Sequence, residues 1–161
     1  LLKLAAERAE VGEELFADKD EKAGNPWLFK AFYQGGPKVK QGQSAEDVLF
    51  QMQSEIIREL AEKEDCLIVG RCADYILQDT ADCLKVFIHA DMAFRAKRIV
   101  EVYGEREQSP EERLRDKDKR RAAYHRFYTN MKWGHAQNYH LTLDSGAIGI
   151  DKCVDIIAAL Y

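Results

Sequence analysis

The stretch CLIVGRCADYIL, residues 66–77, contains an apolar run, a glycine and an arginine in direct succession. Residues 66–69 are all apolar, and such short continuous runs are typical of a central parallel strand that is covered on both faces. Gly70 breaks the run, and Arg71 follows it at once. We therefore predict a buried strand over 66–69, a turn at Gly70, and a solvent-facing cation, Arg71, at the carboxyl end of the strand.

Two further segments have the pattern of strands. LKVFIHA, residues 84–90, and YHLTL, residues 139–143, are short and rich in apolar, β-branched and aromatic side chains. Segments with helical character separate the three predicted strands. Because strands that alternate with helices form parallel sheets with crossover connections, the sequence predicts an α/β fold.

Helical patterns occupy most of the remaining chain. The strongest lies at 110–128, where Ser109, Pro110 and Glu112 match a capping box with proline at the first helical position. Ser44 begins a similar pattern, and the apolar residues that follow it share one helical stripe. That stripe contains Leu49, Met52, Ile56, Ile57 and Leu60. Helices are also predicted at 91–104 and 150–160, and one or two helical turns at 73–82.

Composition limits the classes of protein that the chain can represent. It has 161 residues, 46% hydrophobic and 32% charged, which is typical of one globular domain. The net charge of −4 argues against nucleic acid as a partner, and no apolar run is long enough to span a membrane. Four cysteines lack C-x-x-C spacing, so we expect reduced thiols and a cytoplasmic protein. Leu1 already lies in a helical rhythm, so we expect a preceding segment, and residues 34–43, QGGPKVKQGQ, predict a mobile loop.

The three predicted strands end in polar or glycine-containing turns at 69–71, 88–91 and 143–146. Ligands of open parallel sheets bind outside the carboxyl ends of the strands, so we expect Arg71 to face a ligand crevice. The arginine fork suits two parallel hydrogen bonds to phosphate oxygens. From the residues alone, a phosphate contact and the more common surface turn both remain open.

A second set of arginines lies between the second and third predicted strands. Arg95 and Arg98 are three residues apart and therefore share a helix face. The long helix adds further charges in alternation: Arg113, Asp116, Lys117, Asp118, Lys119, Arg120, Arg121 and Arg126. Alternating charge favours a solvated, salt-bridged helix. Two arginine-bearing helices in tandem also have the arrangement of a hinged lid that closes over a polyphosphate.

Four segments, taken in order, resemble the cytidylate kinase-like family of P-loop proteins. They are CLIVGRCADYIL, KVFIHADMAFRAKRI, DKDKRRAAYHRFYTNMKWGHAQNYHLTLDS and GIDKCVDIIAAL. The resemblance covers about residues 44–161. It implies a three-layer α/β/α P-loop NTPase-type fold with a parallel sheet and a helical lid. Residues 1–161 would then form a single domain that is incomplete at its N-terminus, with an acceptor-side insertion at about 15–43 and lid-like helices at about 95–120.

The same resemblance implies ATP-dependent phosphoryl transfer, with Mg²⁺, to a nucleoside monophosphate or another small phosphate acceptor. Arg71 would hold the acceptor phosphate, and Asp118 would contact the acceptor ribose or base. Arg95 and Arg98 would face the donor ATP, and Arg121 would bridge the phosphates. Arg98 and Arg121 are therefore the expected catalytic residues. Such catalysis rests on positioning and charge neutralisation, so several arginines are the expected equipment.

This sequence departs from the pattern of cytidylate kinases in two places. Cytidylate kinases have the motif DGRD where this chain has VGRC, so Val69 and Cys72 replace both carboxylates. Metal assistance and a preference for cytidine are therefore not implied. Asp74 is a carboxylate that lies nearby in the sequence. The chain also contains no G-x-x-x-x-G-K-[ST] loop, which we expect in a preceding segment. The alternative interpretation is a catalytically inactive nucleotide-binding or assembly module on the same fold.

The remaining candidates are histidines and aromatic residues. The four histidines lack metal-ligand spacing, so no metal site is predicted, and we interpret His89 as a packed residue. Aromatic and apolar residues at helical spacing favour core packing over base stacking: these are Tyr124, Phe127, Tyr128, Met131 and Trp133. A second aromatic cluster, Trp27, Phe29, Phe32 and Tyr33, is expected at the acceptor side or at the surface of a homodimer.

Overall fold

The structure is a computed structural model that describes residues 45–80 and 82–160. The chain divides into two compact units, Leu1–Asp79 and Thr80–Tyr161. Each unit is described below by itself. The predicted loop at 34–43, the insertion at about 15–43, the cap at Ser44 and the N-terminal aromatic cluster lie outside the described residues.

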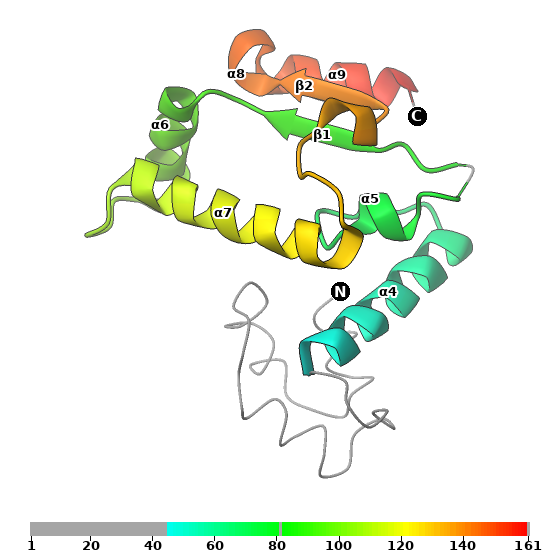
Figure 1. Ribbon diagram of the computed structural model, residues 1–161. Helices are drawn as coiled ribbons and strands as arrows, with labels where there is room; N and C mark the ends of the chain where they lie inside the picture. Colours follow the sequence, from blue (N-terminus) through cyan, green and yellow to red (C-terminus); the bar gives the residue numbers. More distant parts are fainter. Residues whose placement is uncertain (1–44, 81, 161) are drawn as a thin grey trace. The chain divides into compact units, whose positions relative to one another are not determined.

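The described part of the first unit contains helix α4, Ala45–Lys63, and the short helix α5, Ala73–Ile76 (Figure 1). The predicted apolar stripe of α4 is confirmed, because Met52, Ile56 and Ile57 are buried. The other two residues of the stripe, Leu49 and Leu60, are half-buried. Apolar burial on one face therefore stabilises this helix, as periodicity predicted.

The predicted strand at 66–69 is not formed. Residues 65–69 connect α4 to α5 without helix or strand, and the side chains of Leu67 and Val69 are 91% and 82% exposed. A fully apolar run becomes a buried strand only when neighbouring strands take its backbone hydrogen bonds. The described part of the first unit contains no strand that could take these hydrogen bonds. The predicted break at Gly70 is confirmed, since the backbone turns there with φ of 72°.

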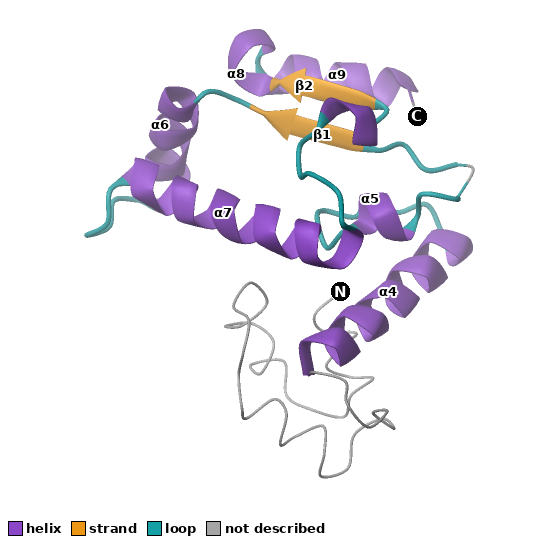
Figure 2. Ribbon diagram, in the orientation of Figure 1, coloured by secondary structure: helices purple, strands orange, loops and turns teal. Residues whose placement is uncertain are grey.

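The second unit contains a parallel pair of strands, which confirms the predicted α/β class. Strand β1, Val86–His89, pairs with β2, Leu141–Asp144, so that Val86 lies opposite Leu141 and His89 opposite Asp144 (Figures 1 and 2). β1 is shorter than the strand predicted at 84–90. β2 begins and ends later than the strand predicted at 139–143.

A side-chain hydrogen bond marks where the ladder begins. The backbone N–H of Lys85 donates to Nδ1 of the His140 ring at 3.3 Å, while the Lys85 carbonyl accepts from the backbone of His140 at 2.9 Å and of Leu141 at 3.2 Å. The two residues before the second strand, Tyr139 and His140, therefore lie outside regular pairing.

Two helices follow β1 and form a hairpin. Helix α6 spans Met92–Tyr103 and α7 spans Pro110–Thr129, both close to prediction. The capping box of α7 is confirmed: the Ser109 hydroxyl accepts from the backbone of Glu112, and the Glu112 carboxylate accepts from the backbone of Ser109. Between the helices lies a small apolar cluster whose buried members are Ala96, Ile99 and Leu114.

The rest of the second unit packs around the sheet. A 3-10 turn, η1 (Ala136–Asn138), precedes β2, and α8 (Ser145–Ile148) and α9 (Ile150–Leu160) follow it, as predicted for 150–160. The ring of Phe87 on β1 makes edge contact with Trp133 at a centroid distance of 5.4 Å. No helix among the described residues is both long and apolar enough to cross a membrane.

Candidate functional site

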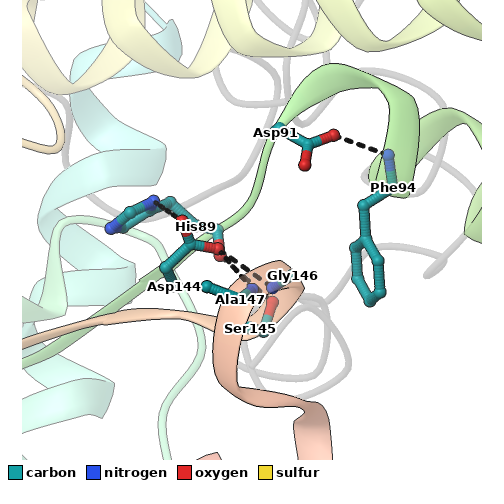
Figure 3. Close-up of polar contacts among 7 residues, drawn as sticks. All are labelled: His89, Asp91, Phe94, Asp144, Ser145, Gly146 and Ala147. Carbon is teal, nitrogen blue, oxygen red and sulfur yellow. Dashed lines mark hydrogen bonds and ion pairs between the residues drawn. The ribbon is translucent and has the colours of Figure 1, made fainter.

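The carboxyl ends of β1 and β2 bring two predicted polar turns together. Residues 88–91 and 143–146 were both expected at the ligand-binding edge of a parallel sheet, and Figure 3 shows His89 of the first turn beside Asp144 of the second. The third predicted turn, 69–71, belongs to the first unit. The site can therefore be built within the second unit from strand ends that the sequence placed to within one residue.

Asp144 is the most fully held side chain at this edge. Its Oδ1 atom accepts hydrogen bonds from the backbone N–H groups of Gly146 at 3.0 Å and Ala147 at 3.1 Å (Figure 3). Its Oδ2 atom lies 4.0 Å from Nδ1 of His89. These backbone bonds fix the carboxylate, as in an N-cap, and leave Oδ2 turned toward the histidine ring.

His89 is not a packed residue, and that prediction was wrong. Its side chain is 49% exposed beside the carboxylate of Asp144, because β1 ends at this residue. The ring also stacks at 6.4 Å on Phe87, two residues earlier on the same face of the strand. A period-two pattern that ends in histidine just before a helix cap was the signal in the sequence that could have revealed it.

The first residues of α6 and α8 pack closely at the same edge. Asp91 caps α6, since its Oδ1 atom accepts from the backbone N–H of Phe94 at 2.8 Å (Figure 3). A Cβ atom at Gly146 would lie 3.2 Å from the Cβ of Ala90 and 3.4 Å from the ring of Phe94. Glycine at 146 therefore permits the two helix starts to approach each other.

The α6–α7 hairpin joins two of the predicted site residues to each other. Arg95 donates from Nη1 and Nη2 to the two carboxylate oxygens of Asp118, at 2.7 and 2.8 Å. Both side chains are about three-quarters buried, with 28% and 25% of their surface exposed. The hydrogen bonds to Asp118 raise the pKa of Arg95 above its usual value, while burial opposes that increase. The resemblance assigned these two residues to different substrates.

The other arginines of the hairpin differ in their environment. Arg98 on α6 and Arg121 on α7 are exposed. Arg113 is buried and donates from Nη1 to the carbonyl of Gly104 at 3.3 Å, in the segment that connects the helices. The long helix is therefore only partly the solvated, salt-bridged helix that its alternating charge favoured.

Arg71 lies in a left-handed turn of the first unit. Gly70, Arg71 and Cys72 have φ angles of 72°, 58° and 55° in succession, a conformation that costs non-glycine residues energy. The Arg71 side chain is half-buried rather than freely solvent-facing. Cys72 is buried, and burial raises the pKa of its thiol to about 12, with Asp74 adding to the increase and Arg71 opposing it.

A model of the cytidylate kinase-like family matches residues 1–147. The chain belongs to the cytidylate kinase-like family. Membership confirms the resemblance stated above and, with the parallel strands, indicates a P-loop-like kinase fold. It also indicates a kinase-like, nucleotide-binding protein in general terms.

Three solved chains are similar to this member of the cytidylate kinase-like family. One of them is an uncharacterized protein from Eubacterium ventriosum ATCC 27560, with 33% sequence identity and a TM-score of 0.65. The similarity covers 70% of this chain and 64% of that chain, so the chain spans a little under two thirds of its neighbour. No curated protein matches the chain.

The Gly-Arg turn of this cytidylate kinase-like chain is flanked by two uncharged residues, Val69 and Cys72. A thiol whose pKa is about 12 carries no charge at neutral pH, so Cys72 does not act as an anion beside Arg71. Val69 is exposed and uncharged. Asp74 is the nearest carboxylate along the chain and is half-buried in the first turn of α5.

The carboxylates of the second unit suit a metal that arrives with its substrate. Among residues 45–80 and 82–160, no three His, Cys, Asp or Glu side chains are grouped so that they could hold a metal ion. Mg²⁺ commonly keeps several waters and is bound through substrate phosphates with one or two carboxylates. Exposed Asp91 and half-buried Asp144 at the strand edge are side chains of that kind.

The aromatic residues of the long helix are only partly packed. Phe127 is 74% exposed, so the prediction of core packing was wrong for this residue. It makes an edge contact with Tyr128, whose ring also lies 4.8 Å from that of Tyr124. Trp133 packs against Phe87, as core packing predicted. Helical spacing could not separate these cases, because it does not specify which neighbour covers the face.

Proposed function

We propose that the protein transfers the γ-phosphoryl group of ATP to a nucleoside monophosphate or another small phosphate acceptor. The observation that carries the proposal is the position of two exposed cations, Arg98 and Arg121, on the hairpin that begins at Met92. That hairpin follows the carboxyl end of β1 directly, where ligands of parallel sheets bind. Family membership supports nucleotide binding in general terms.

In this proposal the hairpin supplies positive charge beside the phosphate oxygens on which negative charge changes during transfer. ATP brings the transferable phosphoryl group, and Mg²⁺ bound to its phosphates lowers their repulsion. Arg98 contacts the donor phosphates, and Arg121 bridges donor and acceptor phosphates. During transfer the bond between the γ-phosphorus and the bridging oxygen breaks while a bond to the acceptor phosphate oxygen forms. Guanidinium groups stabilise the charge on these oxygens better than water does, because they are already oriented.

We propose that Arg71 binds a phosphate group of the acceptor. Its neighbours Gly70 and Cys72 share its left-handed conformation. Strained backbone of this kind is concentrated at ligand sites, and here it supports a role for the turn beyond chain reversal. The planar guanidinium would bind two phosphate oxygens side by side.

A second candidate function is a nucleotide-binding module without turnover. Its support is that exposed Val69 and buried Cys72 are both uncharged. The resemblance to cytidylate kinases implies a carboxylate at each of these two positions. Such a module would bind nucleotides tightly in calorimetry and release no ADP. The two candidates therefore differ in turnover and agree in binding.

ADP release by the full-length protein in the presence of ATP, Mg²⁺ and CMP, dCMP or UMP tests the proposal. We expect turnover with at least one acceptor, and a loss of about tenfold or more in kcat for Arg98→Ala and for Arg121→Ala. Lys97→Ala is the matched control, because Lys97 is exposed on the same helix and pairs only weakly with Glu101 at 3.8 Å. Binding without ADP release would favour the nucleotide-binding module. The absence of both nucleotide binding and ADP release would reject both candidate functions.

A further inference from the structure

The ion pair between Arg95 and Asp118 is the most complete polar contact of the hairpin. Both terminal nitrogens of the guanidinium and both carboxylate oxygens take part, at 2.7 and 2.8 Å. This bidentate geometry is the strongest arrangement for such a pair, and partial burial protects it from screening by salt. The two residues are separated by 23 positions and join different helices.

Two further contacts described between α6 and α7 accompany the pair. Arg95 lies in the first turn of α6, and the buried guanidinium of Arg113 contacts Gly104 just beyond its last turn. The apolar cluster of Ala96, Ile99 and Leu114 lies between these two polar contacts along the chain. Because α6 is held at both ends and in its middle, the hairpin is built to move as one body.

Arg98 and Arg121 are two of the exposed arginines of the hairpin, and each lies close along its helix to one member of this pair. Arg98 follows Arg95 by three residues, and Arg121 follows Asp118 by three residues. Residues three apart in a helix are neighbours on its surface. Because Arg95 contacts Asp118 while Gly104, at the end of α6, contacts Arg113, the two helices run in opposite directions, and Arg98 and Arg121 lie on opposite sides of the pair along the hairpin.

We propose that Arg95 and Asp118 are positioning residues, which clamp α6 to α7 and keep Arg98 and Arg121 at a constant separation around the phosphates. This inference rests on the proposed function. Paired with Arg95, the carboxylate of Asp118 adds no net negative charge beside a polyphosphate. Without Arg95, the carboxylate of Asp118 would repel the negatively charged substrate. The pair is therefore better suited to holding α6 and α7 together than to binding two substrates separately.

A double-mutant cycle with a charge swap tests the clamp in the full-length protein. The variants are Arg95→Gln, Asp118→Asn, the neutral double variant that combines them, and the swapped double variant Arg95→Asp/Asp118→Arg. Hydrogen exchange of backbone amides in residues 99–114 reports on the hairpin without any need for turnover. Steady-state kinetics with ATP and the best acceptor reports on kcat and on both KM values.

A clamp predicts equal and non-additive effects. Each single variant should speed hydrogen exchange and lower kcat about fivefold to tenfold, with either KM changed less than about twofold. The neutral double variant should be no worse than either single variant, because the pair acts as a unit. The swapped variant should recover most of the loss. Lys97→Gln, which removes the exposed pair with Glu101 on the same helix, should change neither readout.

Separate substrate contacts predict a different result. A large rise in acceptor KM for Asp118→Asn, without a matching effect of Arg95→Gln, would overturn the clamp, and so would losses that multiply in the neutral double variant. If the swapped variant does not fold, the neutral double variant still decides. Absence of turnover in the unmodified protein would reject the proposed function alone, and hydrogen exchange would then decide whether the pair clamps the helices.

Discussion

His89 lies directly opposite Asp144 in the parallel pairing of β1 and β2, with 4.0 Å between Nδ1 of the ring and Oδ2 of the carboxylate. The contact arises from register alone, since the two residues are 55 positions apart and each is the last of its strand. Asp144 is held independently of the histidine by two backbone N–H groups. The strand edge therefore presents a carboxylate whose orientation is set by the start of α8.

The cap formed by Asp144 should contribute measurably to stability. Asp144→Ala removes the acceptor for the backbone N–H groups of Gly146 and Ala147, so we expect a loss of about 1 kcal/mol in the free energy of unfolding. Asp144→Asn keeps an oxygen in that position and should lose less. Urea denaturation measures both values. Equal losses for the two variants would show that charge, and not capping, is what matters.

Gly134 should tolerate a side chain less well than Gly70. Both residues have positive φ, 70° and 72°, so alanine strains the backbone at either position. A Cβ atom at Gly134 would also lie 2.7 Å from the ring of Phe87, whereas nothing lies within 4 Å at Gly70. We expect Gly134→Ala to cost at least about 1 kcal/mol more than Gly70→Ala. Thermal unfolding of the two variants compares them, and an equal fall in Tm would contradict the contact with Phe87.

Cys72 should be inert to thiol reagents and should make stability depend on alkaline pH. The folded state holds the thiol proton up to a pKa of about 12, whereas the ordinary value is 9.0. Its contribution to stability is therefore complete below pH 9 and is lost as the pH rises from 9 toward 12. At pH 8 the exposed Cys66 should react with an aromatic disulfide reagent while Cys72 does not.

The variant Cys72→Ala isolates this effect from other groups that titrate at alkaline pH. Its unfolding free energy should decline less between pH 9 and pH 11 than that of the unmodified protein. Parallel declines, or labelling of Cys72 as fast as of Cys66, would show that the thiol is accessible in the folded state.

Arg71 should separate backbone strain from ligand binding. Because its φ angle is 58°, Arg71→Gly should be roughly 0.5–1 kcal/mol more stable than Arg71→Ala, since glycine adopts this conformation without strain. Both variants remove the guanidinium, so both should raise the acceptor KM more than the ATP KM. Chemical denaturation and kinetics give the two comparisons. If activity follows stability across the two variants, Arg71 acts as a structural arginine.

Local patterns predicted the helices and the class of fold well. Three features depend on residues only a few positions apart, so the sequence alone specifies them: the capping box at Ser109 and Glu112, Pro110 at the first position of α7, and the apolar stripe of α4. The sequence alone also places Arg98 and Arg121 on these two helices, where both are exposed. Strand ends were less certain, because the ladder begins where Lys85 meets His140, and that contact depends on both segments.

The sequence by itself determined the family, the parallel α/β class and the residue types available for phosphate binding. Only the tertiary structure decided that the apolar run at 66–69 stays unpaired, that His89 stands beside Asp144, and that Arg95 and Asp118 bind each other. The physical reason is the separation along the sequence of the residues that interact. Helix caps and stripes depend on neighbours three or four residues away, whereas strand pairing and ion pairs between helices depend on segments that only folding brings together.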